Sequence, residues 1–269
     1  MRGKLSKSTL ESISEQLPDI RGLQETVIPL TPDMISMHFN TTSTIPNASV
    51  CLYDTVSALQ EARYALHEAI AHKIWYLDKD NPSNELAVFF SRFYADDVTL
   101  RLYAAGEYLA EAIADMLEIA PSAIAKFEKK RVSRQSIVGN YLRKERPSHP
   151  ITSVILQLAD SKEWRSTIAY RDEWVHSQPP LIEGLGTLFR RGSRWKISTD
   201  GKGYKLGIEL GDEPEYTIDD LLNFIRPALI KFAEAVTAVV AYYIELRKKQ
   251  QEENATKDQD PKASEARSG

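Results

Sequence analysis

Hydrophobic residues recur along most of the chain at spacings of three and four, which is the pattern of amphipathic helices. The clearest stretch starts at Tyr53 and predicts a long helix to Leu77, with Val56, Leu59 and Leu66 on one face. The same spacing predicts four more helices, over about 85–119, from Pro121 onward, over about 152–176, and after Thr217.

The last helix carries two local signals of its own. Thr217 and Asp220 have the spacing of a capping box, with aspartate where glutamate is usual. Pro227 lies well inside the apolar pattern, and a proline there removes a backbone hydrogen bond. We therefore expect the helix to begin at Thr217 and to bend at Pro227.

Between the fourth and the last helix the pattern changes to alternation, which is typical of strands. Trp195, Ile197 and Thr199 alternate with charged or small residues, and the segment 204–208 does the same. The intervening Asp-Gly-Lys-Gly, at 200–203, is a hairpin turn signal, and residues 185–189 are a candidate third strand.

These patterns predict one mainly α domain: a helical bundle of four to five long helices with a β-hairpin inserted before the last helix. Residues 1–50, with prolines and Thr/Ser/Asn clusters, are expected to form an irregular lead-in. The helical domain spans 51–250, with the hairpin insertion at about 185–210. Residues 251–269 lack apolar anchors and are expected to be disordered.

Composition indicates a globular chain and excludes several classes of protein. The 269 residues carry a formal net charge of −4, so contact with nucleic acid requires a local basic patch. Cys51 is the single cysteine, which excludes an internal disulfide and fits a reducing cytosol. No segment resembles a signal peptide, and the longest apolar run, 235–244, is too short to span a bilayer. We expect a cytoplasmic protein that does not enter a membrane.

One segment does supply a basic patch. Residues 126–146 contain eight basic residues against two glutamates, a formal charge of +6. The segment predicts an RNA-binding surface that tracks phosphates, although a solvated helix face has the same composition. The candidate RNA-binding residues, with Tyr141 as a base-stacking partner, are Lys129, Lys130, Arg131, Arg134, Tyr141 and Arg143.

The chemistry-bearing residues of the chain gather at the end of the fourth helix, just before Pro179. Asp172 and His176 are four residues apart and share a helix face, so the carboxylate is expected to orient the imidazole. Arg171 is about 140° away from His176 around an ideal helix. Joint action of Arg171 and His176 is therefore expected to need a distorted helix end or a cleft between two subunits. The five histidines form no recognisable metal-ligand cluster, and no metal or cofactor is predicted.

Arg171-Asp172-x-x-x-His176 resembles the arginine–polar–x3–histidine signature of the HEPN superfamily, α-helical bundle proteins that include prokaryotic toxins and defence proteins. The resemblance implies a homodimer formed through the motif helix and, in active members, metal-independent cleavage of RNA to a 2′,3′-cyclic phosphate. It also implies catalytic roles for Arg171 and His176, with Asp172 as a modulator.

Two other interpretations stay open at this stage. In the first, Arg171, Asp172 and His176 form only a surface ion pair at a capped helix end, worth under about 1 kcal/mol. In the second, the chain is a noncatalytic HEPN-like dimer that binds a nucleotide or a partner protein. An antitoxin or a nucleotidyltransferase is a candidate partner for either form.

Overall fold

The structure is a computed structural model, and it is mainly helical. It describes residues 5–30, 44–78, 82–127, 133–177, 179–185, 194–199, 204–209 and 211–259.

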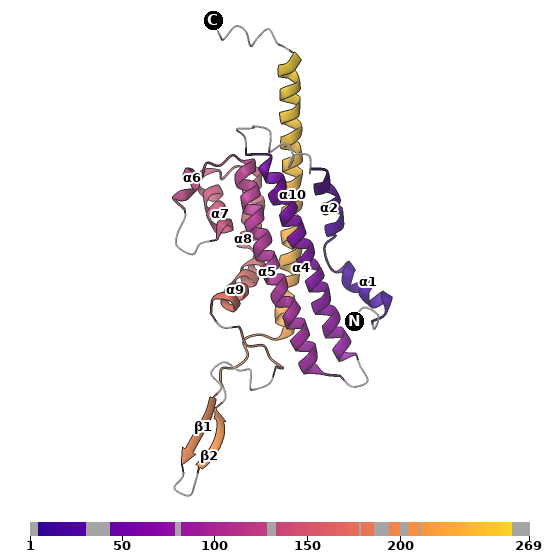
Figure 1. The fold of residues 1–269 in the computed structure, drawn as a ribbon, viewed down its shortest axis with the longest axis vertical. Helices are drawn as coiled ribbons and strands as arrows, with labels where there is room; N and C mark the ends of the chain where they lie inside the picture. Colours follow the sequence, from indigo (N-terminus) through magenta and orange to yellow (C-terminus); the bar gives the residue numbers. More distant parts are fainter. Residues whose placement is uncertain are drawn as a thin grey trace.

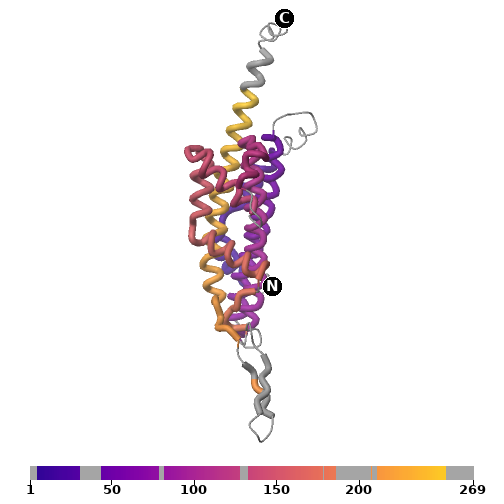
Figure 2. Tube along the Cα trace, turned by 90° about the vertical axis from the view of Figure 1, so that its left-hand side faces the viewer, coloured from indigo at the N-terminus to yellow at the C-terminus, as the bar shows by residue number. Residues whose placement is uncertain are grey.

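Three long helices form the centre of the bundle: α4 (Asn47–Leu77), α5 (Asn84–Met116) and α10 (Ile218–Gln259). They run side by side in two perpendicular views (Figures 1 and 2). Fully buried alanines on the facing sides of α4 and α5, such as Ala62, Ala65 and Ala105, let the two backbones approach closely. Leucine, isoleucine and valine side chains of all three helices fill the remaining core.

Four shorter helices cover one side of this centre: α6 (Pro121–Ala125), α7 (Arg134–Glu145), α8 (Pro150–Asp160) and α9 (Lys162–His176) (Figure 1). The single helix expected over 152–176 is therefore wrong. Ser161 ends α8 with extended backbone (φ −67°, ψ 140°) and caps α9, where its side chain accepts a hydrogen bond from the Trp164 N–H. The break lets α9 turn against α5 while its apolar spacing stays nearly unchanged.

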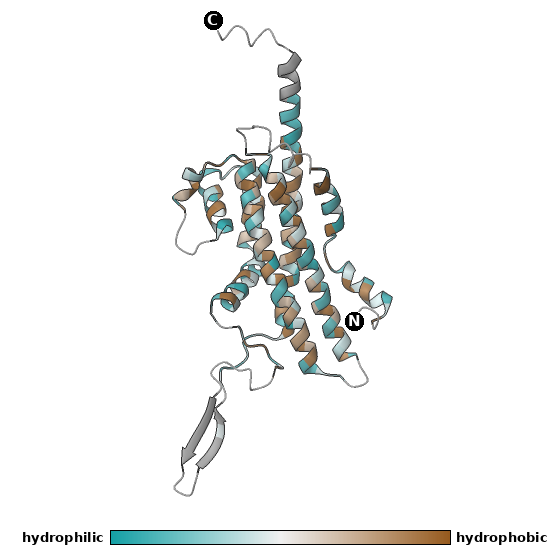
Figure 3. Cartoon of the chain, in the orientation of Figure 1, coloured by the Kyte–Doolittle hydropathy of each residue, from teal (hydrophilic) through white to brown (hydrophobic). Residues whose placement is uncertain are grey.

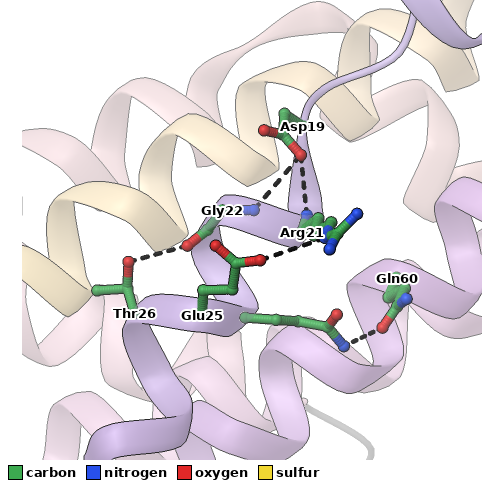
Figure 4. Close-up of polar contacts among 7 residues, drawn as sticks. Asp19, Arg21, Gly22, Glu25, Thr26 and Gln60 are labelled. Carbon is green, nitrogen blue, oxygen red and sulfur yellow. Dashed lines mark hydrogen bonds and ion pairs between the residues drawn. The ribbon is translucent and has the colours of Figure 1, made fainter.

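Residues 20–27 are helical, so an irregular lead-in is wrong for this segment. Here α1 (Lys7–Glu15) and α2 (Ile20–Val27) precede a short 3-10 turn, η1 (Ile28–Leu30), and α2 buries Ile20, Leu23 and Val27 against the core. Asp19 caps α2 through the Arg21 and Gly22 N–H groups (Figure 4). Gln24 of α2 also hydrogen-bonds Gln60 of α4. The spacing of three and four, flanked by prolines, contained the signal for this helix.

The strands β1 (Arg194–Thr199) and β2 (Tyr204–Glu209) pair antiparallel, with Trp195 opposite Ile208 and Ile197 opposite Leu206. The turn expected at 200–203 and nearly all of the expected strand 185–189 lie outside the described residues. Ile182 and Tyr216 form an isolated bridge, so the chain leaves and re-enters the bundle at one place.

The predicted capping box at the start of α10 is confirmed. The Thr217 N–H and hydroxyl donate to Asp220 Oδ2 at 2.8 and 2.7 Å, and the Asp220 N–H donates back to Thr217 Oγ1 at 3.0 Å.

The helix α10 includes Pro227 and continues to Gln259, so the prediction of disorder from 251 is wrong as far as 259. The helix extends beyond the bundle, and the protruding turns that Figure 3 colours are hydrophilic (Figures 1 and 3). Glutamine, glutamate, lysine and alanine favour a helix there through their intrinsic propensity. In the part of the chain that the structure describes, no helix has the length and apolar character needed to cross a membrane.

Candidate functional site

The structure brings the three motif side chains together within one chain. Arg171 Nη1 lies 2.8 Å from Asp172 Oδ1 and 3.4 Å from His176 Nε2, at the C-terminal end of α9. The guanidinium therefore joins carboxylate and imidazole without a distorted helix or a second subunit, and the expectation that one of these was needed is wrong. The long arginine side chain spans the offset of about 7.5 Å along a regular helix.

The expected pairing of Asp172 with His176 is also wrong. Asp172 is paired with Arg171, and among the described residues no contact joins its carboxylate to the imidazole. The adjacent guanidinium is the stronger attractor because its charge is permanent, whereas imidazole is charged only when protonated. Asp172 consequently restrains Arg171, and of these two residues only Arg171 contacts the His176 ring.

The contact between Arg171 and His176 limits the roles that the two side chains can take in it. A guanidinium has only donors, so Nε2 of His176 is the acceptor of this contact in the tautomer that carries its proton on Nδ1. His176 is exposed at the last position of α9, where solvent reaches the ring. An imidazole in this tautomer can act as a general base at Nε2 once a substrate has displaced the contact with Arg171.

Two residues of α5 hold this end of α9, and sequence reasoning missed both. The Tyr170 hydroxyl donates to Asp96 Oδ1 at 2.5 Å inside the core, and the guanidinium carbon of Arg171 lies 3.7 Å from the centre of the Tyr103 ring. Asp96 and Tyr103 are seven residues apart, two turns along one face of α5. Their spacing is an ordinary core spacing, so only the packing of α9 on α5 gives it a role.

The network around Asp96 is electrostatically strained. Burial raises the pKa of Asp96 above its ordinary value, while the hydrogen bond from Tyr170 and the positive charge of Arg92 oppose that rise. Burial likewise raises the pKa of Tyr103, helped by the charge of Glu107 and opposed by Arg171 and by a hydrogen bond with Ser133. At neutral pH the Tyr103 ring is therefore the neutral phenol, and its π face is available to a cation.

The motif side chains line a cleft of ≈ 1290 Å³ whose walls come from α5, α7, α8 and α9. The floor is apolar and includes Phe232 of α10, on which Trp164 stacks at 5.1 Å between ring centroids. Four arginines and three carboxylates line the cleft, which gives a formal charge of only +1: Arg134, Arg143, Arg165, Arg171, Glu107, Asp160 and Asp172. The cleft is large enough for a nucleotide, but its lining is not strongly basic.

The predicted RNA-binding residues divide into three groups. Arg134 and Arg143 line the cleft, and each is paired, Arg134 with Glu111 at 2.7 Å and Arg143 with Asp160 at 3.0 Å. Lys129, Lys130 and Arg131 lie outside the described residues.

Tyr141 does not fit the predicted role of stacking on a base. Its side chain is only 8% exposed, and its ring packs edge-on against Phe127. Hydrophobic spacing along α7 places Tyr141 with Ile137, Val138 and Leu142 on the buried face. An aromatic residue at such a position belongs to the core.

A second polar cluster lies in α4, away from the cleft. Glu68 has His67 Nδ1 at 3.6 Å and His72 Nε2 at 3.8 Å, and all three side chains are buried. Burial lowers the pKa of His72, against the opposing charge of Glu68, and its ring packs among Phe90 and Tyr94. Across the described ranges, no group of three or more His, Cys, Asp or Glu side chains is arranged to hold a metal ion.

Comparisons with known proteins do not place this site in a family. No protein-family model matches the sequence, and neither the curated proteins nor the solved structures give a significant match.

Proposed function

We propose that this chain is a metal-independent endoribonuclease of the HEPN type, which cleaves RNA through attack by a ribose 2′-OH. One observation carries the proposal: Arg171 and His176, separated by five positions in the sequence, meet at 3.4 Å on the wall of a cleft that can admit a nucleotide. A permanent cation beside an imidazole supplies charge stabilisation and proton transfer, which phosphodiester transfer without a metal needs.

The proposed reaction uses both side chains. With the contact to Arg171 Nη1 displaced by the substrate, the Nε2 lone pair of His176 takes the proton of the 2′-OH as the 2′ oxygen attacks the adjacent phosphorus. The bond from phosphorus to the 5′ oxygen breaks, and that oxygen takes a proton, from water or from a second imidazole. Arg171 donates hydrogen bonds to the non-bridging oxygens, whose negative charge grows in the transition state. The products carry a 2′,3′-cyclic phosphate and a 5′-hydroxyl.

A homodimer formed through α9 would supply the second imidazole. Each copy contributes the same residues across a two-fold axis, which would also double the positive charge around the phosphate. We place the enzyme in the cytoplasm, in defence or stress response, with an antitoxin or a nucleotidyltransferase as its partner. In this proposal the β-hairpin is an insertion that smaller HEPN toxins lack.

The noncatalytic alternative rests on the charge of the cleft. Arg134, Arg143 and Arg171 are each paired with a carboxylate, so little unpaired positive charge remains to attract a polyanion. A cleft with an apolar floor and few free charges suits a single nucleotide or a protein segment better than a long RNA. In this alternative Arg171 and His176 serve only to bind a ligand or to stabilise a dimer interface.

Cleavage of a short RNA with a defined sequence tests the proposal. The wild-type protein should cut it in the presence of EDTA and leave 2′,3′-cyclic phosphate ends, and a single 2′-deoxy substitution should block cleavage at that position. Arg171→Ala and His176→Ala should each abolish cutting while the protein stays folded. Arg21→Ala is the matched control, because Arg21 is an exposed arginine of α2 outside the cleft. Unchanged cleavage by His176→Ala would refute the catalytic role.

A further inference from the structure

The hydrogen bonds of Arg171 are distributed unevenly over its guanidinium. Nη1 uses both Asp172 and His176, and Nε is buried without a hydrogen-bond partner. Among the described residues none accepts a hydrogen bond from Nη2, which is not among the buried unpartnered atoms. The edge formed by Nη2 is therefore the one that remains to bind a ligand.

The plane of the guanidinium is set by packing. The Tyr103 ring lies 3.7 Å below the guanidinium carbon, and the Arg171 side chain is only 14% exposed. A ring on one face prevents rotation of the planar fork, while Asp172 and His176 hold one of its ends. The three contacts together restrain the guanidinium and leave Nη2 without a hydrogen-bond partner among the described residues.

We propose that Tyr103 is a positioning residue that orients Arg171 for catalysis through its aromatic face. The inference rests on the proposed ribonuclease function, and it adds a residue from another helix to a motif that lies wholly in α9. Tyr103 needs no contact with the substrate in this role, because it acts through the direction of the Arg171 N–H groups.

The ring, and not the hydroxyl, is the part that acts on Arg171. The Tyr103 hydroxyl interacts with Ser133, which caps α7, whereas the guanidinium carbon lies over the ring. Phenylalanine at 103 keeps the aromatic face and loses only the link to Ser133. Leucine fills similar space but has no π face and allows the guanidinium to rotate.

Steady-state cleavage of the short RNA tests this role, with KM and kcat determined separately from the dependence of the rate on RNA concentration. Tyr103→Leu should lower kcat by about tenfold or more with KM changed less than threefold, and Tyr103→Phe should keep kcat within about threefold of wild type. Tyr108→Leu is the matched control, since Tyr108 lies on the same helix, is exposed and does not line the cleft. Equal kcat for Tyr103→Leu and wild type, with folding verified by circular dichroism, would overturn the proposal.

A second measurement separates this inference from the proposed function. Solvent exchange of the Arg171 Nε–H, followed by NMR and assigned with Arg171→Lys, does not depend on cleavage. The proton should be protected in the wild type and in Tyr103→Phe, and should exchange rapidly in Tyr103→Leu. If the wild type cleaves no RNA but this pattern holds, the catalytic proposal fails and the positioning of Arg171 by Tyr103 stands. If the three proteins exchange alike, the positioning role fails whether or not RNA is cut.

Discussion

Removing the Tyr170 hydroxyl is the sharpest test of how α9 is held on α5. In Tyr170→Phe the Asp96 carboxylate loses a donor at 2.5 Å and keeps only Arg92, at 3.6 Å, as a polar partner. Hydrogen bonds to charged groups contribute about 1.5–3 kcal/mol, and a buried acceptor left without its donor costs about 1–3 kcal/mol. We expect the free energy of unfolding to fall by about 2 kcal/mol, which lowers Tm by about 4–8 °C in a chain of this size.

Urea unfolding followed by circular dichroism measures this loss, read from a lower midpoint at unchanged slope. Tyr141→Phe is the control, because Tyr141 is a buried tyrosine of α7 whose hydroxyl makes no hydrogen bond to the described residues, and its change should stay within about 0.5 kcal/mol. A double-mutant cycle with Asp96→Leu should give a coupling of about 1.5–2 kcal/mol. If the two single changes are additive, with a coupling below about 0.5 kcal/mol, the hydrogen bond from Tyr170 to Asp96 does not hold α9 on α5.

The sign of the pH dependence gives an independent check on the same pair. The Tyr170 hydroxyl lowers the pKa of Asp96 against the rise caused by burial, so its removal moves that pKa further up. When Asp96 is protonated, its carboxyl group no longer carries the buried negative charge that the Tyr170 hydroxyl stabilises. The difference in stability between wild type and Tyr170→Phe should therefore be largest at neutral pH and should narrow as pH falls through the Asp96 pKa. A gap that widens toward acid pH would contradict this assignment.

Three further predictions concern sites away from the cleft. Burial, with Asp115 and Glu111, raises the pKa of Cys51 to about 11, so iodoacetamide at pH 8 should alkylate it about 100-fold more slowly than a thiol of pKa 9.0; equal rates would contradict the shift. Thr217→Ala should cost about 1 kcal/mol in urea unfolding, and Thr217→Ser almost nothing, because serine keeps the capping oxygen. Burial lowers the pKa of His72 below 6.5, against the charge of Glu68, so the unfolded chain binds a proton that the native chain does not. Stability should fall as pH drops below 6.5, and His72→Gln should reduce that fall in urea midpoint between pH 7 and 5; the same fall in both proteins would exclude His72 as its cause.

Much of the fold could be predicted from the sequence, because most of its information is local. Apolar spacing predicted the helical class and the long helices, and Thr217 with Asp220 predicted the start of α10. Breaks in the helices were harder to predict. Ser161 interrupts an apolar pattern that continues on both sides, and α2 has only eight residues between prolines. Helix propensity also kept α10 intact to Gln259, where no hydrophobic pattern signalled it.

The sequence by itself determined which side chains stand at the end of α9, since Arg171, Asp172 and His176 are neighbours along the chain. Only the tertiary structure decided how they pair, because the reach of an arginine side chain is not given by helical angles. It also decided that Tyr103 and Asp96 belong to the site and that Tyr141 belongs to the core. A residue on another helix acquires its role from the packing of two surfaces, and no spacing within a single helix records which surface will face it.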